Sequence, residues 1–148
     1  MVLNTEHLGE IEFQKEDIIH FPKGIPGFEE EKEFIVVLTG DIEFPFSYLQ
    51  SVKSNDLAFI VTDPFLFLVD YDFELSDEDA EFIGITKVEQ VDDIAIYSIV
   101  TIPEDVDQTT INISAPIVIN LKDKLGKQVL LKEYDEMKHP LFKQKSGE

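Results

Sequence analysis

The side chains that could do chemistry are few in kind and lie far apart along this chain. There are three histidines, His7, His20 and His139, and no cysteine. No two histidines stand at a metal-ligand spacing and the HExxH pattern is absent, so the sequence gives no zinc site. The lack of cysteine excludes disulfides and thiolate chemistry. We therefore interpret His20, within an apolar stretch, and His139, before Pro140, as structural residues.

The acidic residues raise two other kinds of site. Four of them suggest a calcium loop at first sight: Asp70, Asp72, Asp77 and Asp79. An EF-hand needs a glycine at its sixth position and a terminal glutamate, and this order does not match, so a solvated acidic face is the better interpretation. Paired carboxylates could serve a glycosidase, but nothing in the sequence singles out a pair. The nucleophile elbow, the dinucleotide fingerprint and the P-loop are also absent, and we expect neither a metal nor a cofactor.

Charge is the unusual property of the composition. The 148 residues include 12 Lys+Arg and 31 Asp+Glu, which gives a net charge of −19. Such a field repels the phosphates of nucleic acid and attracts basic proteins. Solubility alone is another explanation of the acidity. Because no catalytic pattern stands out, the sequence favours an interaction protein. The alternative is a small-ligand-binding or carbohydrate-active β-barrel that uses paired carboxylates.

Short apolar and alternating stretches set the expected fold class. They recur at roughly 8–12-residue intervals between turn residues, which is typical of a sandwich or barrel. We expect an all-β domain over residues 1–142, a small closed or nearly closed antiparallel β-barrel with one or two short helices. Residues 143–148 should form a polar, frayed tail. The apolar runs 34–38 and 65–69 are read as strands, either buried on both faces of the barrel or exposed to a partner.

The elements around the strands have local signals of their own. Ser76 is expected to cap a short helix over residues 77–82, since acids in the first turn suit the helix dipole, and Gly84 should end it. A short strand is expected at residues 87–91. Pro116 cannot donate to a β-ladder, so the chain should bend or bulge there.

Residues 21–29 predict a rigid corner. Pro26-Gly27 suits the two central positions of a type II turn. Phe21, Ile25 and Phe28 are large apolar residues that surface loops seldom carry, and we expect all of them to hold the turn against the core. The start of the chain has no basic region followed by a long apolar run, and no stretch approaches the roughly 18 residues of a membrane span. We expect a cytoplasmic protein.

Several short motifs, taken in order, resemble the flagellar assembly factor FliW family. Their order and spacing carry the resemblance, which spans residues 3 to 142: Gly24-Ile25-Pro26-Gly27-Phe28-Glu29, Leu49-Gln50-Ser51, Ala58-Phe59, Asp63-Pro64, Val100-Thr101, Asn112, Ala115-Pro116-Ile117-Val118-Ile119-Asn120 and His139-Pro140-Leu141. There are two departures. Ile113 stands where the family commonly has Leu, and Lys138 stands where Arg is usual and lacks its bidentate fork.

The resemblance implies a non-catalytic β-barrel that binds flagellin. It also implies binding of the RNA-binding translational repressor carbon storage regulator A, by a non-competitive, allosteric mode. In the implied circuit, free flagellin occupies the protein, and export of flagellin releases it to capture the repressor, so that flagellin translation resumes.

The candidate site residues follow from the motifs and the charge. Polar members or neighbours of the motifs are candidate partner contacts: Gln50, Ser51, Asn55, Asp63 and Asn112. Acidic groups are candidates for electrostatic capture of the basic repressor: Asp77, Glu78, Asp79, Glu104, Asp105 and Asp107. The residues expected to be structural are Gly24, Pro26, Gly27, Phe28 and Pro116.

Overall fold

The computed structural model describes residues 1–6, 8–37, 46–68, 70–71, 73–85, 93–134 and 138–141. Its strands are β1 (Val2–Thr5), β2 (Gly9–Glu12), β3 (Ile19–His20), β4 (Glu33–Val37), β5 (Phe46–Ser51), β6 (Ala58–Thr62), β7 (Ile94–Thr101), β8 (Thr110–Ile111), β9 (Ile117–Asn120), β10 (Leu125–Gln128) and β11 (His139–Pro140). Its helical segments are the α-helix α1 (Asp77–Phe82) and the 3-10 turns η1 (Lys15–Asp17), η2 (Pro64–Leu66) and η4 (Val106–Gln108).

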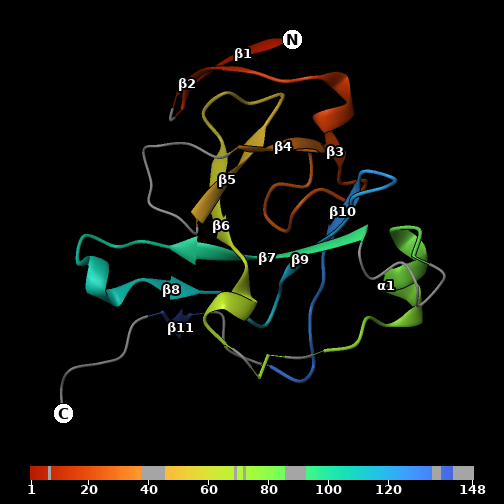
Figure 1. Ribbon diagram of the computed structural model, residues 1–148, viewed down its shortest axis with the longest axis vertical. Helices are drawn as coiled ribbons and strands as arrows, with labels where there is room; N and C mark the ends of the chain where they lie inside the picture. Colours follow the sequence, from red (N-terminus) through yellow and green to blue (C-terminus); the bar gives the residue numbers. More distant parts are fainter. Residues whose placement is uncertain are drawn as a thin grey trace.

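The strands close into a barrel, as the sequence predicts (Figure 1). The wall runs β7-β6-β5-β4-β3-β10-β9, and β9 also pairs with β7, which completes the ring. Neighbouring strands of the ring are antiparallel except β3 and β10, which form a short parallel pair at Leu125 and His20. Strands β8 and β11 extend the sheet beyond β7, and β1 and β2 form a separate hairpin.

Apolar side chains fill the barrel. Alternate residues of each strand face inward, so Phe34, Leu49 and Val61 from three neighbouring strands meet Ile117 and Ile119 of β9 in one buried cluster. The intervening residues of these strands are also covered. Ile35 is 2% exposed because it packs outside the wall against Phe13 and Ile18. The described part of the first apolar run, residues 34–37, is therefore covered on both faces.

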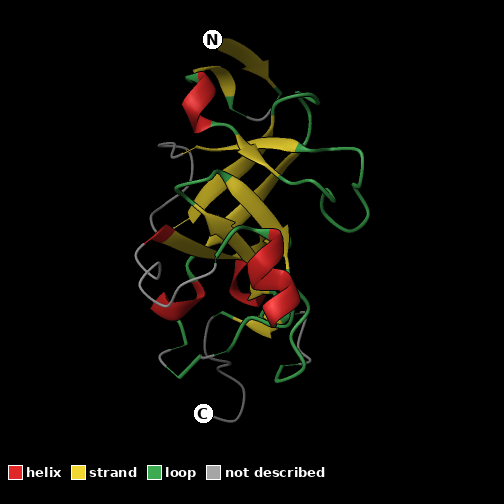
Figure 2. Cartoon of the chain, turned by 90° about the vertical axis from the view of Figure 1, so that its right-hand side faces the viewer, coloured by secondary structure: helices red, strands yellow, loops and turns green. Residues whose placement is uncertain are grey.

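A second cluster covers the opposite outer wall. Val100 of β7 and Val118 of β9 pack there against Tyr71, Ile83 and Val129. Helix α1 lies over this side, and Figure 2 shows it in front of the sheet. Because β7 and β9 are covered on both faces, their sequences read as continuous apolar runs rather than as alternating ones.

Residues 65–68 of the second apolar run do not form a strand, and that prediction was wrong. The segment after β6 turns into η2, with Asp63 as its cap and Pro64 at its first position. The Asp63 side chain accepts a hydrogen bond from the Phe65 N–H at 2.9 Å. An Asx cap followed by proline starts a helical turn, and this local chemistry outweighs the β-propensity of the residues that follow.

The corner is the predicted turn, with one correction. The Phe28 N–H donates to the Ile25 carbonyl at 2.6 Å, and Gly27 has a φ of 90°, as the third position of a type II turn requires. Phe21 and Ile25 are buried, but Phe28 is 42% exposed. Its ring packs edge-on against Phe59 with centroids 5.3 Å apart. Phe28 therefore lies against the cluster that fills the barrel without entering it, because the type II turn carries it outward.

A lysine closes the loop that the corner makes. The Lys32 Nζ donates to the carbonyls of Pro22 and Glu29, each at 3.0 Å. The Lys32 carbonyl in turn accepts from the Phe21 N–H at 2.8 Å. The Gly27 N–H donates to the Glu29 carboxylate, and this bond is the main reason that the pKa of Glu29 is lowered. The two ends of the corner are thus held together by hydrogen bonds as well as by packing.

The other local predictions stand as follows. Ser76 caps α1 by accepting from the Asp79 N–H at 3.1 Å, and Gly84 follows the helix with a φ of 81°. Strand β8 ends at Ile111, the chain turns, and Pro116 enters the ladder only as an acceptor, from the Val129 N–H at 2.9 Å. The expected strand 87–91, the tail 143–148, His7 and Asp72 lie outside the described residues.

Replacing Gly24 by Ala should destabilise the protein more than replacing Gly27 by Ala. Both glycines have a positive φ, which costs an L-residue about 1–2 kcal/mol. A Cβ at Gly24 would also lie 2.6 Å from the Glu29 backbone, whereas at Gly27 it would meet nothing within 4 Å. Overpacking should add about 1–3 kcal/mol at Gly24. Urea titration measures both free energies of unfolding, and an equal or larger loss at Gly27 would contradict this account.

Candidate functional site

Two of the predicted partner contacts are buried. Gln50 and Ser51 at the end of β5 are both 0% exposed. The Gln50 Nε2 donates to the carbonyl of Ser51 at 2.9 Å and to that of Ser54 at 3.3 Å. Their side chains cannot touch a partner in this conformation, which corrects the prediction for both. They shape the turn between β5 and β6.

A carboxylate joins this turn to the corner. The Ser51 Oγ donates to Glu31 Oε1 at 2.5 Å, and the Ser54 Oγ donates to Glu31 Oε2 at 2.8 Å. The bond from Ser51 is the main reason that the pKa of Glu31 is lowered. The sequence gives no signal for this role of Glu31, because its partners are 20 and 23 residues away and no local pattern links them. Asn55, at the tip of the same turn, is exposed and stays a candidate contact.

Asp63 and Asn112 are half-buried and hold turns. Asp63 caps η2, as described above. The Asn112 Oδ1 accepts from the N–H and the hydroxyl of Ser114 and from the N–H of Ala115, each at 3.1 Å. Through these bonds Asp63 and Asn112 stabilise the turns in which they lie. Whether they also contact a partner stays a prediction.

The acidic candidates form two separate groups. Asp77, Glu78 and Asp79 lie in the first turn of α1, whereas Glu104, Asp105 and Asp107 lie in the loop between β7 and β8. Figure 1 places α1 and this loop on opposite sides of the molecule, with β7 running between them. The structure therefore does not bring the six acids into one site.

One acid of the helix already has a cation. Asp79 forms an ion pair with Lys127. The Nζ of Lys127 also lies 5.1 Å from the ring centroid of Phe82, and Lys23 lies 4.7 Å from the same centroid. Asp77 and Glu78 are exposed. Of the three helix acids, these two are the better placed to meet a basic partner.

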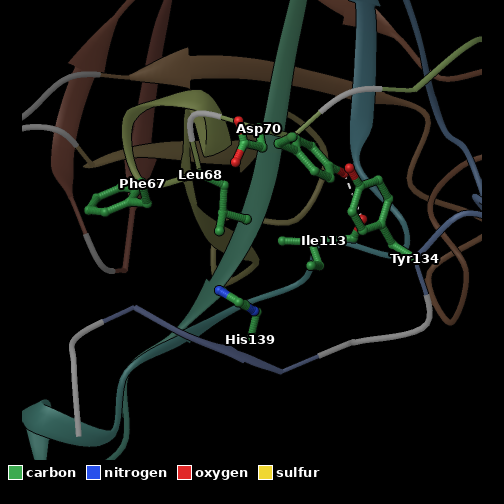
Figure 3. A pocket seen from close by; sticks show the side chains of 7 residues that line it. Phe67, Leu68, Asp70, Ile113, Tyr134 and His139 are labelled. Carbon is green, nitrogen blue, oxygen red and sulfur yellow. Dashed lines mark hydrogen bonds between the residues drawn. The ribbon is translucent and has the colours of Figure 1, made fainter.

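An apolar cleft opens near β11 (Figure 3). Its volume is about 380 Å³, and its lining comes from segments far apart in the sequence: Phe67, Leu68, Asp70, Tyr71, Ile113, Tyr134 and His139. The Tyr71 hydroxyl donates to the Ile113 carbonyl at 2.6 Å, and its ring lies 4.8 Å from that of Tyr134. Burial raises the pKa of Tyr71, so this hydroxyl stays protonated as a donor. The cleft suits an apolar group of a partner.

The barrel interior does not fit the carbohydrate-active alternative. That alternative needs a deep polar cavity with two close carboxylates. Instead, the interior is filled by apolar side chains, and no carboxylate is among the buried residues of the described chain. Within the same residues, no group of His, Cys, Asp and Glu is arranged to hold a metal ion. No helix in the described ranges is long and apolar enough to cross a membrane.

Known proteins resemble this chain over nearly its whole length. The sequence model described as "FliW protein" matches residues 2–141. A protein named flagellar assembly factor FliW from Alkaliphilus metalliredigens (strain QYMF) is 47% identical over 131 residues, which is 88% of this chain and 79% of that protein. The protein of the same name from Clostridium botulinum (strain Langeland / NCTC 10281 / Type F) is 40% identical over 147 residues, 99% of this chain and 100% of that protein.

A solved structure agrees with these matches. The crystal structure of the flagellar assembly factor FliW superposes with a TM-score of 0.88 at 40% identity, and the match covers 98% of this chain and 99% of that one. The barrel and the resemblance seen in the sequence are thereby confirmed. The chain belongs to the FliW family of flagellar assembly factors.

Proposed function

We propose that this protein is a protein-binding regulator that binds flagellin and, when free of it, sequesters carbon storage regulator A. Family membership supports the role in flagellar assembly. Binding of carbon storage regulator A is supported by the net charge of −19, on a chain whose relatives are named as assembly factors. Sequestration of the repressor then frees the flagellin mRNA for translation.

Electrostatics supplies a physical reason for repressor capture. A protein that binds RNA must carry basic residues. Exposed acids on both sides of this barrel attract such a protein over roughly a Debye length, about 8–10 Å at physiological salt. Long-range attraction of this kind raises the association rate more than it raises the final affinity. The acidic surface thus selects a basic partner before any contact forms.

The placement of the acids favours a non-competitive mode. A mimic of RNA would present its negative charges as one continuous strip. Here the acids of α1 and of residues 104–107 lie on opposite sides of the barrel. This arrangement supports binding beside the RNA-binding face, with displacement of RNA by field or by a conformational shift. Flagellin, by contrast, is proposed to use the apolar cleft, where a helical segment could place an apolar side chain beside Leu68 and Ile113.

Salt should separate the two partners. Mixed with purified repressor, this protein should bind it at least tenfold more weakly at about 500 mM than at about 50 mM salt, because screening removes the attraction. Flagellin binding should change much less, since apolar burial is not screened. Titration calorimetry at both salt concentrations measures this difference. A salt-independent repressor affinity would contradict electrostatic steering, and no complex with either partner would sink the proposed function.

Removing the acids of the β7–β8 loop should slow repressor capture. The variant combines Glu104→Lys, Asp107→Lys and Asp105→Asn. Asparagine keeps the side-chain oxygen that accepts from the residue-107 N–H at 3.1 Å. We expect the association rate to fall about tenfold at low salt, with little change in dissociation.

The control for this variant changes net charge equally at exposed positions of the N-terminal region. It combines Glu10→Lys, Glu12→Lys and Glu16→Gln. Stopped-flow association rates should be lower for the loop variant than for this control. Equal rates for the two variants would assign the effect to net charge and reject a role for the loop.

A further inference from the structure

The ladder between β9 and β10 continues past the end of β10. The Val129 N–H donates to the Pro116 carbonyl at 2.9 Å, and the Leu131 N–H donates to the Ser114 carbonyl at 2.8 Å. These pairs keep the register of the strands, in which Gln128 faces Ile117. Residues 129–131 are therefore an extended edge segment held on one side by residues 114–116.

The backbone N–H and C=O of Leu130 lie on the side of this segment that faces away from residues 114–116. In an antiparallel ladder, residues alternate between those that bond to the partner strand and those whose N–H and C=O point away from it. Val129 and Leu131 bond to the partner, so the backbone groups of Leu130 point the other way. Within the described chain, no hydrogen bond uses them. The Leu130 side chain is 81% exposed, whereas Val129 and Leu131 are buried.

A groove runs along this open side. Its volume is about 470 Å³. One wall is the edge segment with Lys132 and Glu133, and the other wall is the entry to α1, from Glu74 to Asp79. In Figure 1 the blue chain that leaves β10 runs down to the left of α1, towards the green segment that leads into the helix. We call this feature the edge groove.

The charges of the edge groove favour a basic occupant. Glu74, Glu78 and Glu133 are exposed along its walls, while Lys132 is the exposed cation there. Asp79 is already paired with Lys127. The remaining acids flank an exposed leucine and an open strand edge. This combination of donor, acceptor, apolar surface and negative charge matches an extended peptide that carries lysine or arginine around an apolar residue.

We propose that the edge groove binds an extended segment of the basic partner, which adds to the sheet beside Leu130. This inference rests on the proposed function and names the surface that holds the repressor. The added segment would pair with the N–H and C=O of Leu130, while its basic side chains reach Glu74, Glu78 and Glu133. Such pairing gives affinity through the main chain and selectivity through the flanking charges.

The position of the groove also bears on the switch between partners. Glu133 lines the edge groove, and its neighbour Tyr134 lines the apolar cleft. The two surfaces meet at this pair of residues. A partner in the cleft and a partner in the groove would therefore be neighbours along the chain at residues 133 and 134.

Leu130→Pro tests the edge directly, with Leu130→Ala as its matched control. Proline is tolerated on an edge strand where the lost N–H faces away from the ladder, so the fold should survive. The proline variant loses the free donor, whereas alanine keeps it. We expect the dissociation constant for purified repressor to rise about five- to tenfold more for proline than for alanine. Flagellin should bind both variants within about twofold of the unmodified protein, which also checks folding.

The charges are tested by Glu74→Lys with Glu78→Lys, against the matched exposed pair Glu10→Lys with Glu12→Lys. The groove pair should raise the repressor dissociation rate at least fivefold over the control pair. If the unmodified protein binds the repressor but neither groove variant weakens it beyond its control, the groove assignment is wrong and the proposed function stands. Equal loss of both partners by a folded variant overturns the assignment too. If the unmodified protein binds neither partner, both proposals fall.

Discussion

The barrel depends on β9, a strand of four residues that pairs on both of its sides. All four residues are buried, and they bond to β7 on one side and to β10 on the other. Asn120 at its end adds a third connection, since its Nδ2 donates to the Ile83 carbonyl at 2.7 Å just after α1. The same short strand, β9, thus closes the ring and helps to place α1. A ring closed in this way has few edges, which limits where another chain can add.

The corner at residues 21–29 helps to position β10, which pairs with β9 in the ring. Phe21 packs against Gly126 of β10 so tightly that a Cβ there would lie 2.7 Å from its ring. Strand β3 touches β10 only around Leu125, and beyond this point nothing from β3 covers the chain. The edge segment at residues 129–131 is therefore a direct consequence of the architecture. The ring needs β10 for closure, but it leaves the continuation of β10 open on one side.

Local chemistry made most of the fold predictable. The Pro26-Gly27 turn and the Ser76 cap follow from signals within a few residues. The barrel follows from the regular spacing of short apolar stretches along the chain. The wrong predictions share a cause. Phe28 and Gln50 were judged by residue type, yet the exposure of a side chain depends on the direction in which its turn points it, and Gln50 is turned inward, where it donates to the carbonyls of Ser51 and Ser54. Gln50 looks like a surface residue until the carbonyls that accept from it are known.

The edge groove could not be predicted from the sequence for a related reason. Its walls come from segments about 50 residues apart, and its key property is a backbone direction that only the register of β9 and β10 defines. The acids of α1 were predicted, but as a general source of attraction. Their position opposite Leu130 could not be read from composition.

An open edge is also a hazard, because it can pair with a second copy of the same chain. The acids beside Leu130 oppose that outcome. Two copies brought edge to edge would place Glu74, Glu78 and Glu133 of one near the same acids of the other, and like charges at close range repel. A basic segment meets the same groove with attraction. The charge proposed to speed encounter with a basic partner would therefore also keep the edge free for it.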